Sequence, residues 1–73
     1  MVMKIKFVLP LTDDSGLRTP TGDPFHPTLD IATYTVIVRS DDFVKLYIGS
    51  IFVAEGKQDF LVELIRTGYV AFV

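Results

Sequence analysis

The sequence predicts a small α+β domain: a mainly antiparallel sheet of three to four strands, with one or two short helices and a long proline-rich loop. Three stretches lead to this prediction. Residues 31–39 are rich in β-branched and aromatic side chains, residues 3–9 alternate between apolar and charged side chains, and residues 58–67 carry apolar side chains at helical spacing. The first two patterns favour strands and the third favours an amphipathic helix. At 73 residues we expect one domain, residues 1–73.

The stretch 31–39 is the most strongly predicted strand. Tyr34, Val36 and Val38 alternate onto one face. The opposite face is only half polar, so both faces are expected to be partly covered. This pattern favours an interior position in the sheet.

Residues 3–9 form the second predicted strand. Ile5 and Phe7 lie on one face, and Lys4 and Lys6 lie on the other. Lysines on the polar face of an edge strand discourage unwanted pairing with other chains, so we expect this strand at an edge.

Residues 10–30 break the pattern. They contain all four prolines of the chain, together with two glycines and several threonines and aspartates. Proline and glycine at this density exclude a helix or a central strand. We therefore expect one long loop.

Residues 41–48 allow two interpretations. Ser40 is a good helix N-cap and Gly49 a suitable helix end, which would make the segment helical. The alternative is a hairpin turn at residues 40–42 followed by a strand, with a β-bulge at residues 49–50. The density of β-branched and aromatic side chains favours the strand.

The last third of the chain begins with a predicted turn at residues 55–57. The helix over residues 58–67 has a poor N-cap, and Gly68 stands where a left-handed helix end belongs. Residues 69–73 are expected to join the sheet as a final strand. The predicted core consists of apolar side chains from all these segments: Ile5, Phe7, Tyr34, Val36, Val38, Leu46, Ile51, Leu61, Leu64, Ile65 and Val70.

Composition narrows the classes of function. The net charge is −2 and the basic residues are scattered, so the basic stripe typical of nucleic-acid binding is missing from the sequence and no direct nucleic-acid partner is expected. No apolar run approaches the roughly 18 residues of a membrane helix, and a cytoplasmic location is expected. Hydrophobic residues make up 49% of this short chain, which predicts an apolar surface patch used by a partner or a second copy.

No motif predicts catalysis. His26 is the only histidine and lies between two prolines, where an exposed loop residue is the ordinary outcome. The aspartates of the 10–30 loop match no calcium-binding spacing, and the isolated glycines form no phosphate-binding loop. We therefore expect no enzyme activity, no cofactor and no metal ion.

The remaining features favour protein binding. Phe25 is a large apolar side chain in a stiff loop, the kind of anchor that dominates interfaces, although folding back onto the core is the favoured alternative for it. Lys4 and Lys6 are suited to an acidic partner, and a solvated strand face is their ordinary alternative. The predicted partner-binding residues are Lys4, Lys6, Phe7, Arg18, Phe25 and His26.

A cysteine-free single-domain chain of this size resembles the small regulators of lytic bacteriophages that bind bacterial RNA polymerase. The resemblance lies in size and character, because this class shares no signature motif. It implies inhibition of transcription initiation, by displacement of the σ factor, or antitermination, in the cytoplasm of the bacterial host. The implied contact segment surrounds Lys4, Lys6 and Phe7. The alternative function is a homo-oligomeric structural or assembly protein, so a monomer or a small oligomer is expected.

Overall fold

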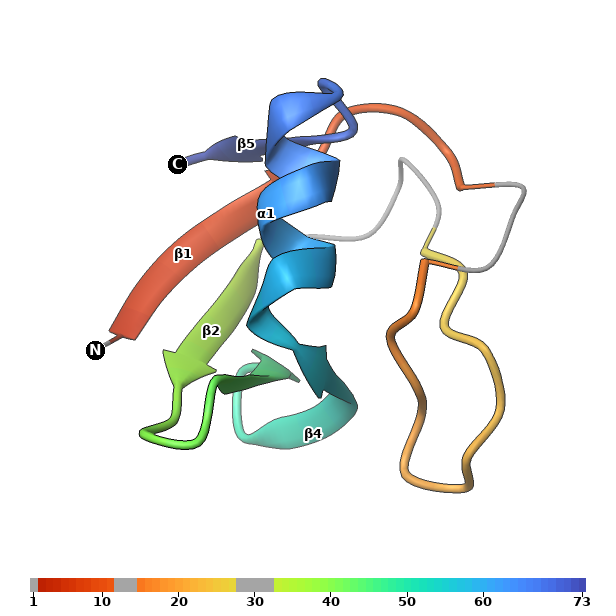
Figure 1. Cartoon of the computed structure of the whole chain (residues 1–73), viewed down its shortest axis with the longest axis vertical. Coiled ribbons are helices and arrows are strands. Elements are labelled where there is room, and N and C mark those ends of the chain that lie inside the picture. The colour runs from red at the N-terminus through yellow and green to blue at the C-terminus, as the bar shows by residue number, and fades with distance from the viewer. Residues whose placement is uncertain (1, 12–14, 28–32) are drawn as a thin grey trace.

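The computed structural model describes residues 2–11, 15–27 and 33–73. Five strands form one sheet in the order β4-β3-β2-β1-β5, and every neighbouring pair is antiparallel. The predicted α+β class is confirmed, but the sheet has five strands where three to four were expected. The elements, in chain order, are β1 (Val2–Phe7), β2 (Tyr34–Val38), β3 (Phe43–Ile48), β4 (Ile51–Lys57), α1 (Gln58–Arg66) and β5 (Val70–Phe72) (Figure 1).

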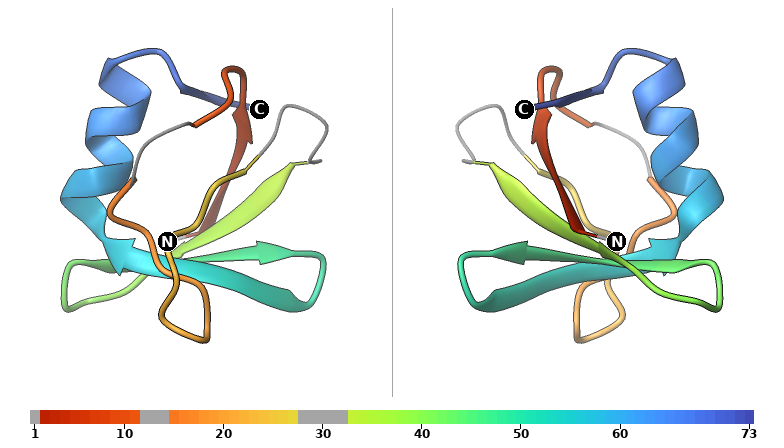
Figure 2. Two further views of the ribbon diagram at one scale, coloured as in Figure 1. Left: turned by 90° about the vertical axis from the view of Figure 1, so that its right-hand side faces the viewer. Right: turned by 90° about the vertical axis from the view of Figure 1, so that its left-hand side faces the viewer.

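The sheet is strongly curved, so that β3 and β4 run steeply across the direction of β1 (Figure 2). Helix α1 covers one side of the space that this curvature encloses, and a loop excursion between β1 and β2 lies beside β4. The core fills the concave side of the sheet.

The positions of the first two strands differ in part from expectation. Strand β2 is interior, as predicted, because β1 and β3 flank it. Strand β1 was expected at an edge and is also interior, since the C-terminal strand β5 pairs with its second side. The lysines of β1 therefore do not protect a sheet edge.

Residues 43–48 form a strand, which settles the helix-or-strand alternative. The β2–β3 turn closes with the Arg39 N–H donating to the Phe43 carbonyl at 2.8 Å, and Asp42 adopts a positive φ of 64° there. Aspartate tolerates this conformation better than most residues.

Residues 49–50 were expected to form a bulge, which is wrong. Ile48 pairs directly with Ile51, so Gly49 and Ser50 are a two-residue hairpin turn. Gly49 has a φ of 60°, as the first central residue of a type II′ turn requires. The irregularity in register lies elsewhere, between Leu46 and Tyr47.

The predicted turn at residues 55–57 is also wrong, because these residues continue β4 to Lys57. Gly56 pairs with Val44 and is buried. Glycine inside a strand often marks a place where another backbone approaches closely, and the loop excursion described below makes that approach.

Helix α1 ends as the sequence predicted. Gly68 has a φ of 88°, its N–H donates to the Ile65 carbonyl, and the Tyr69 N–H donates to the Leu64 carbonyl. This pair of bonds is a Schellman motif. Lys57 provides no side-chain cap at the start, and the Gln58 N–H instead donates to the Asp42 carbonyl at 2.7 Å.

The described part of the 10–30 loop contains a hairpin-like excursion, residues 15–27, which we call the loop hairpin. Arg18 exchanges two backbone hydrogen bonds of 2.8 Å with Glu55 on the outer edge of β4, and the Phe25 N–H donates to the Leu17 carbonyl. A Cβ atom on Gly56 would lie 2.8 Å from Leu17 Cδ2. The absence of that atom lets the loop hairpin pack on β4. Residues 12–14 and 28–30 of the predicted loop lie outside the described residues.

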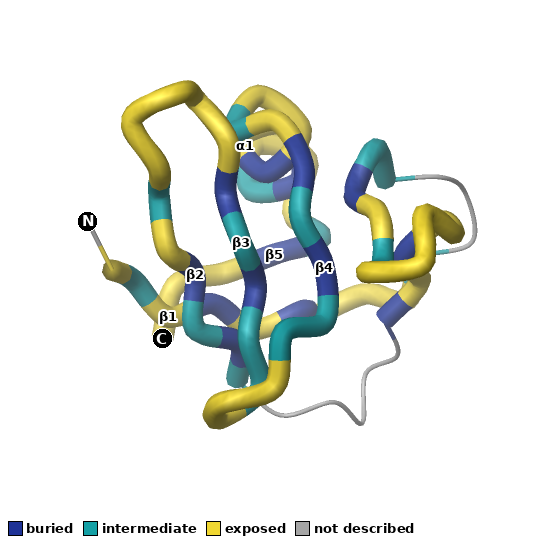
Figure 3. The backbone as a smooth tube through the Cα atoms, turned by 90° about the horizontal axis from the view of Figure 1, so that it is seen from below, coloured by how far each residue is buried: buried dark blue, intermediate teal, exposed yellow. Residues whose placement is uncertain are grey.

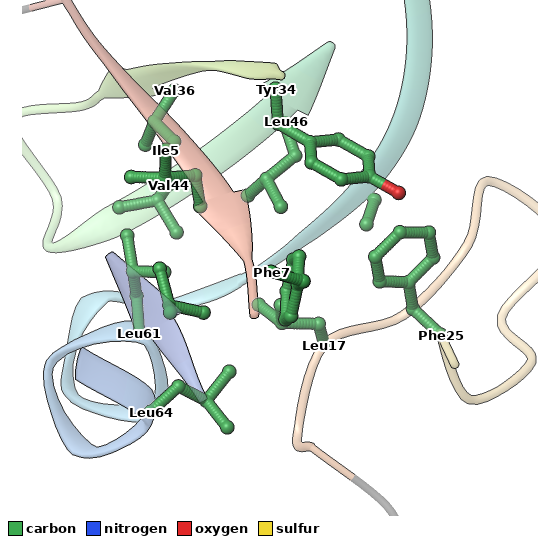
Figure 4. Packing of buried hydrophobic residues seen from close by; sticks show 12 residues of the cluster. Ile5, Phe7, Leu17, Phe25, Tyr34, Val36, Val44, Leu46, Leu61 and Leu64 are labelled. Atoms are coloured by element: carbon green, nitrogen blue, oxygen red, sulfur yellow. The ribbon is translucent and has the colours of Figure 1, made fainter. Parts of the chain in front are cut away.

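Burial alternates along β2, β3 and β4 (Figure 3), and most of the predicted core is buried. Val38 and Ile65 are only partly buried, and Ile51 is 66% exposed because it directly follows the β3–β4 turn. Figure 4 shows the cluster from close by. The buried core consists of Ile5, Phe7, Leu17, Phe25, Tyr34, Val36, Val44, Leu46, Ala54, Leu61, Leu64 and Val70. Of these, Leu17, Val44 and Ala54 are absent from the predicted core, and Phe25 was expected there as the favoured alternative to an interface anchor.

Candidate functional site

The outer side of the sheet, opposite the core, gathers basic and aromatic side chains from four separate segments. Strand pairing places directly opposed residues on the same side of a sheet, so the register alone determines which residues share it. We call this surface the basic face. It comprises Lys4 and Lys6 of β1, Lys45 and Tyr47 of β3, Phe52 and Glu55 of β4, and Arg18 of the loop hairpin.

One row of this face crosses the sheet from β1 to β4. Lys4 pairs with Thr35, Thr35 pairs with Tyr47, and Tyr47 pairs with Phe52. Lys6 lies two residues further along β1, on the same side as Lys4. Both lysines of β1 are exposed.

A second row ends on the loop hairpin. Ile37 of β2 pairs with Lys45, Lys45 pairs with Glu55, and Glu55 pairs with Arg18. The backbone pairing with Glu55 therefore brings Arg18, which is exposed, onto the same side of the sheet as the lysines.

The two aromatic rings of the face touch. The Tyr47 and Phe52 ring centroids are 5.7 Å apart, and the Lys45 Nζ lies 5.4 Å from the Phe52 centroid. A cation over an aromatic ring is attracted by the ring quadrupole. The interaction holds Lys45 against the sheet, and both rings remain partly exposed.

Charge is segregated on this small molecule. The basic face holds four cations and one carboxylate, that of Glu55, although the whole chain has a net charge of −2. Within the described residues, Lys4, Lys6 and Lys45 form no ion pair. The basic face is therefore a positive surface on an acidic protein.

Three other described acids lie at one end of β3 and β4. A hollow of about 500 Å³ is lined there by Asp41, Asp42, Phe43, Lys57, Gln58 and Asp59. The Arg39 guanidinium pairs with Asp41 at 3.2 Å on the same turn. On α1, Glu63 pairs with Arg66, and this exposed contact holds the pKa of Glu63 below its usual value.

Two predicted partner-binding residues are not at the surface. Phe7 is fully buried, and Phe25 is only 9% exposed. Their rings and that of Tyr34 form an edge-to-face cluster with centroid distances of 5.5 to 6.4 Å. Phe25 therefore folds back onto the core, the alternative favoured for it above, and exposes little surface to a partner. Burial likewise removes Phe7 from direct contact with a partner.

The other four predicted residues are exposed. The fold brings Lys4, Lys6 and Arg18 onto the basic face, whereas His26 lies on the second arm of the loop hairpin. Sequence reasoning missed Lys45, Tyr47 and Phe52. Alternation within residues 43–48 was the available signal, because it places Lys45 and Tyr47 together once that segment is a strand.

The Tyr34 hydroxyl is the one described buried polar side-chain atom without a hydrogen-bond partner among the described residues. Burial raises the pKa of Tyr34 to about 12. The hydroxyl therefore stays protonated near neutral pH and cannot act as a general base there.

Three further findings concern the kind of site. Within residues 2–11, 15–27 and 33–73, no group of three or more acidic or histidine side chains is placed to hold a metal ion. The single helix of the described chain is too short to cross a lipid bilayer. Comparison of the sequence and structure with protein-family models, curated proteins and solved structures gives no match.

Proposed function

We propose that this protein is a non-enzymatic regulator that binds an acidic surface of another protein through its basic face. The observation that carries the proposal is the strand register that places Lys4, Lys6, Lys45 and Arg18 on one side of an otherwise acidic chain. Complementary charge accelerates encounter with a partner and fixes its orientation.

The aromatic pair strengthens this proposal. Interfaces are enriched in aromatic side chains and in arginine, because these combine a large apolar area with a polar group. Tyr47 and Phe52 supply that area on β3 and β4, between the cations of β1 and the cation of the loop hairpin. The face thus offers charge for steering and apolar surface for affinity.

We further propose bacterial RNA polymerase as the partner, on the basis of the resemblance to phage regulators. In this view the protein inhibits initiation by competing with the σ factor or modifies elongation by antitermination, in the cytoplasm of the host. Lys4 and Lys6 make the contact, and Phe7 supports them from the core. The whole 10–30 segment acts as one long proline-rich loop that carries Arg18 to the face.

Binding to purified bacterial RNA polymerase, measured by surface plasmon resonance, tests both parts of the proposal. The variants are Lys4→Glu, Lys6→Glu and their combination, and Arg66→Glu on exposed α1 is the control for a charge reversal away from the face. We expect each lysine variant to lower kon several-fold and the double variant to lose at least about tenfold in affinity, with a strong dependence on salt. Arg66→Glu should bind like the parent protein.

The outcomes separate the partner from the face. A parent protein that captures no polymerase subunit contradicts the named partner. Equal losses for Arg66→Glu and the lysine variants contradict the basic face. The same variants are titrated with a single-stranded oligonucleotide, and tighter binding to the oligonucleotide than to polymerase would make nucleic acid the partner of this face.

A further inference from the structure

We propose that the outer side of the sheet binds an extended acidic segment of the partner, which crosses the strands diagonally from Lys4 over Lys45 to Lys57. This inference rests on the proposed function and specifies which part of the partner the basic face receives. It follows from the positions of three cations, from the uncharged strand between two of them and from the curvature of the sheet.

The three lysines lie on one diagonal line across the outer side of the sheet. Lys4 and Lys45 pair with residues of β2 that are two positions apart. Two strand spacings and two residues therefore place their Cα atoms about 12 Å apart. Lys57 continues the line, because it pairs on β4 with Phe43, which precedes Lys45 by two positions on β3. One strand spacing and two residues, about 8 Å, separate Lys45 from Lys57.

The intervals between these lysines match the repeat of an extended chain. Such a chain advances about 3.3 Å per residue and directs alternate side chains to the same side. Its residues i, i+4 and i+6 therefore face the sheet at successive intervals of about 13 Å and about 7 Å. Acidic residues at these three positions place one carboxylate near each ammonium group.

Strand β2 lies between Lys4 and Lys45 and presents only uncharged side chains to the outer side. These are Thr35 and Ile37, and Ile37 is 37% exposed. Position i+2 of the segment lies over them. An apolar side chain at that position covers Ile37 and removes apolar surface from water.

The charges around the line define its path. Within the described residues the three lysines form no ion pair, and Lys45 is held in place over the Phe52 ring. Glu55 pairs with Lys45 and repels a carboxylate from the side of the loop hairpin. Beyond Lys57 lies the hollow with three aspartates that this lysine helps to line, so the acidic part of the segment ends there.

The shape of the surface favours an extended segment over a folded one. The core fills the concave side of the sheet, so the outer side is convex, and β3 and β4 run steeply across the direction of β1 (Figure 2). A flat protein surface or a straight helix touches a convex surface over a short length only. An extended chain bends along the surface and reaches all three lysines.

Titration of the isotope-labelled full chain with synthetic peptides, followed by amide NMR shifts at physiological salt, tests the proposal. The spaced peptide has nine residues, capped at both ends, with glutamates at its second, sixth and eighth positions, leucine at its fourth and glycine or serine elsewhere. The clustered peptide has the same composition with its glutamates adjacent. Exposed ion pairs are individually weak, so we expect a Kd of about 0.1–1 mM for the spaced peptide. It should bind at least about threefold more tightly than the clustered peptide.

Three variants test the path on the protein. Lys45→Glu reverses the central charge and should weaken binding of the spaced peptide at least about fivefold. Glu55→Gln removes the repelling carboxylate and should tighten binding about twofold, a gain that misfolding would not produce. Arg66→Glu, on α1 away from the line, is the control and should bind like the parent protein.

The outcomes separate this inference from the proposed function. Equal affinity for the two peptides, or no effect of Lys45→Glu, would overturn the diagonal path. If neither peptide shifts the amides of the three lysines while binding to polymerase still depends on Lys4 and Lys6, the partner presents a folded surface and only this inference fails. If binding to polymerase is also absent, both fail. A short oligothymidylate that binds the same amides more tightly than the spaced peptide would overturn an acidic protein segment as the occupant.

Discussion

The two edges of the sheet differ in how far other parts of the described chain cover them. At β4, the loop hairpin returns to add a backbone pair between Arg18 and Glu55, and the edge also carries charged side chains and the register irregularity beside β3. At β5, the edge is apolar, regular and bare within the described chain. Both edges belong to the same sheet, but the described chain adds a further backbone pair only at the β4 edge.

The reason lies in what each edge contributes to the core. The loop hairpin brings Leu17, Phe25 and Pro27 into the interior, and each is buried. A chain of this size buries only about 60% of the surface that its unfolded form exposes, so these side chains are a substantial part of the core. The covered edge therefore serves stability, whereas no strand of the described chain pairs with the bare edge of β5.

Leu17→Ala, at the covered edge, should cause the largest loss of unfolding free energy. Leu17 is fully buried at the contact with β4, and removal of a buried leucine side chain costs about 2–5 kcal/mol of unfolding free energy. Urea denaturation measures the change. Val62→Ala, at a position 51% exposed on α1, is the control and should change stability by less than about 0.5 kcal/mol. A similar small change for Leu17→Ala would mean that the loop hairpin is not part of the folded core.

Gly56→Ala tests the close approach of the loop hairpin to β4. The added Cβ would lie 2.8 Å from Leu17 Cδ2 and 3.1 Å from the Gly16 carbonyl oxygen, so we expect a loss of about 1–3 kcal/mol. Combination with Leu17→Ala removes the nearer clash, and the double variant should be more stable than the sum of the two changes predicts. Strict additivity in urea denaturation would contradict this origin of the strain.

Tyr34 should make the stability of the fold depend on pH. Its ring packs edge-to-face against Phe25 of the loop hairpin at 5.8 Å. Its pKa is about 12 in the fold and 10.0 in the unfolded reference, so the folded protein keeps a proton that the unfolded chain loses. The contribution to stability is complete below pH 10 and is lost as the pH rises through 12. At pH 11 the loss is about 1.4 kcal/mol.

Comparison with Tyr34→Phe isolates this effect. The hydroxyl has no partner among the described residues, so its removal should leave stability at pH 8 unchanged or slightly raised. Between pH 8 and pH 11 the variant should lose less unfolding free energy than the parent protein. Identical pH dependence of the two proteins would exclude Tyr34 as the responsible group.

The smallest effect is expected at the bare edge. Phe72→Lys alters a side chain that is 62% exposed, so its unfolding free energy should change by less than about 0.5 kcal/mol. Chemical denaturation at a few micromolar, with Ile51→Lys in parallel, makes the measurement. A loss above about 2 kcal/mol would show that β5 contributes to the fold through Phe72 and would remove the contrast between the edges.

The strands with a clear local pattern could be predicted from sequence. Alternation of apolar and polar side chains predicted β1 and β2. The apolar stripe predicted α1, and Gly68 predicted where it ends. The boundaries of β4 could not be predicted, because Gly49 and Gly56 were both interpreted by local rules. Gly49 makes a hairpin turn, and Gly56 remains inside the strand because a distant segment packs on it.

The candidate site was predictable only where it is local. Lys4 and Lys6 share a face by alternation along one strand, but Arg18 reaches that face through pairing with Glu55, which lies far along the chain. Leu17 stands in a stretch with no periodicity, so no pattern indicated that it is buried. Contacts between distant segments account for Arg18 and Leu17, whereas Lys45 and Tyr47 were missed although alternation within residues 43–48 offered a local signal.

The first hydrogen bond of α1 also connects distant segments. The Gln58 N–H donates to the Asp42 carbonyl, in a turn where Asp42 holds a positive φ. Because Lys57 offers no side-chain cap, the helix start is not fully bonded until the β2–β3 turn has closed. The bond therefore couples the start of the helix to the closed form of this turn. Hydrogen exchange of the Gln58 amide should therefore report openings of the β2–β3 turn, because such an opening breaks its bond to the Asp42 carbonyl.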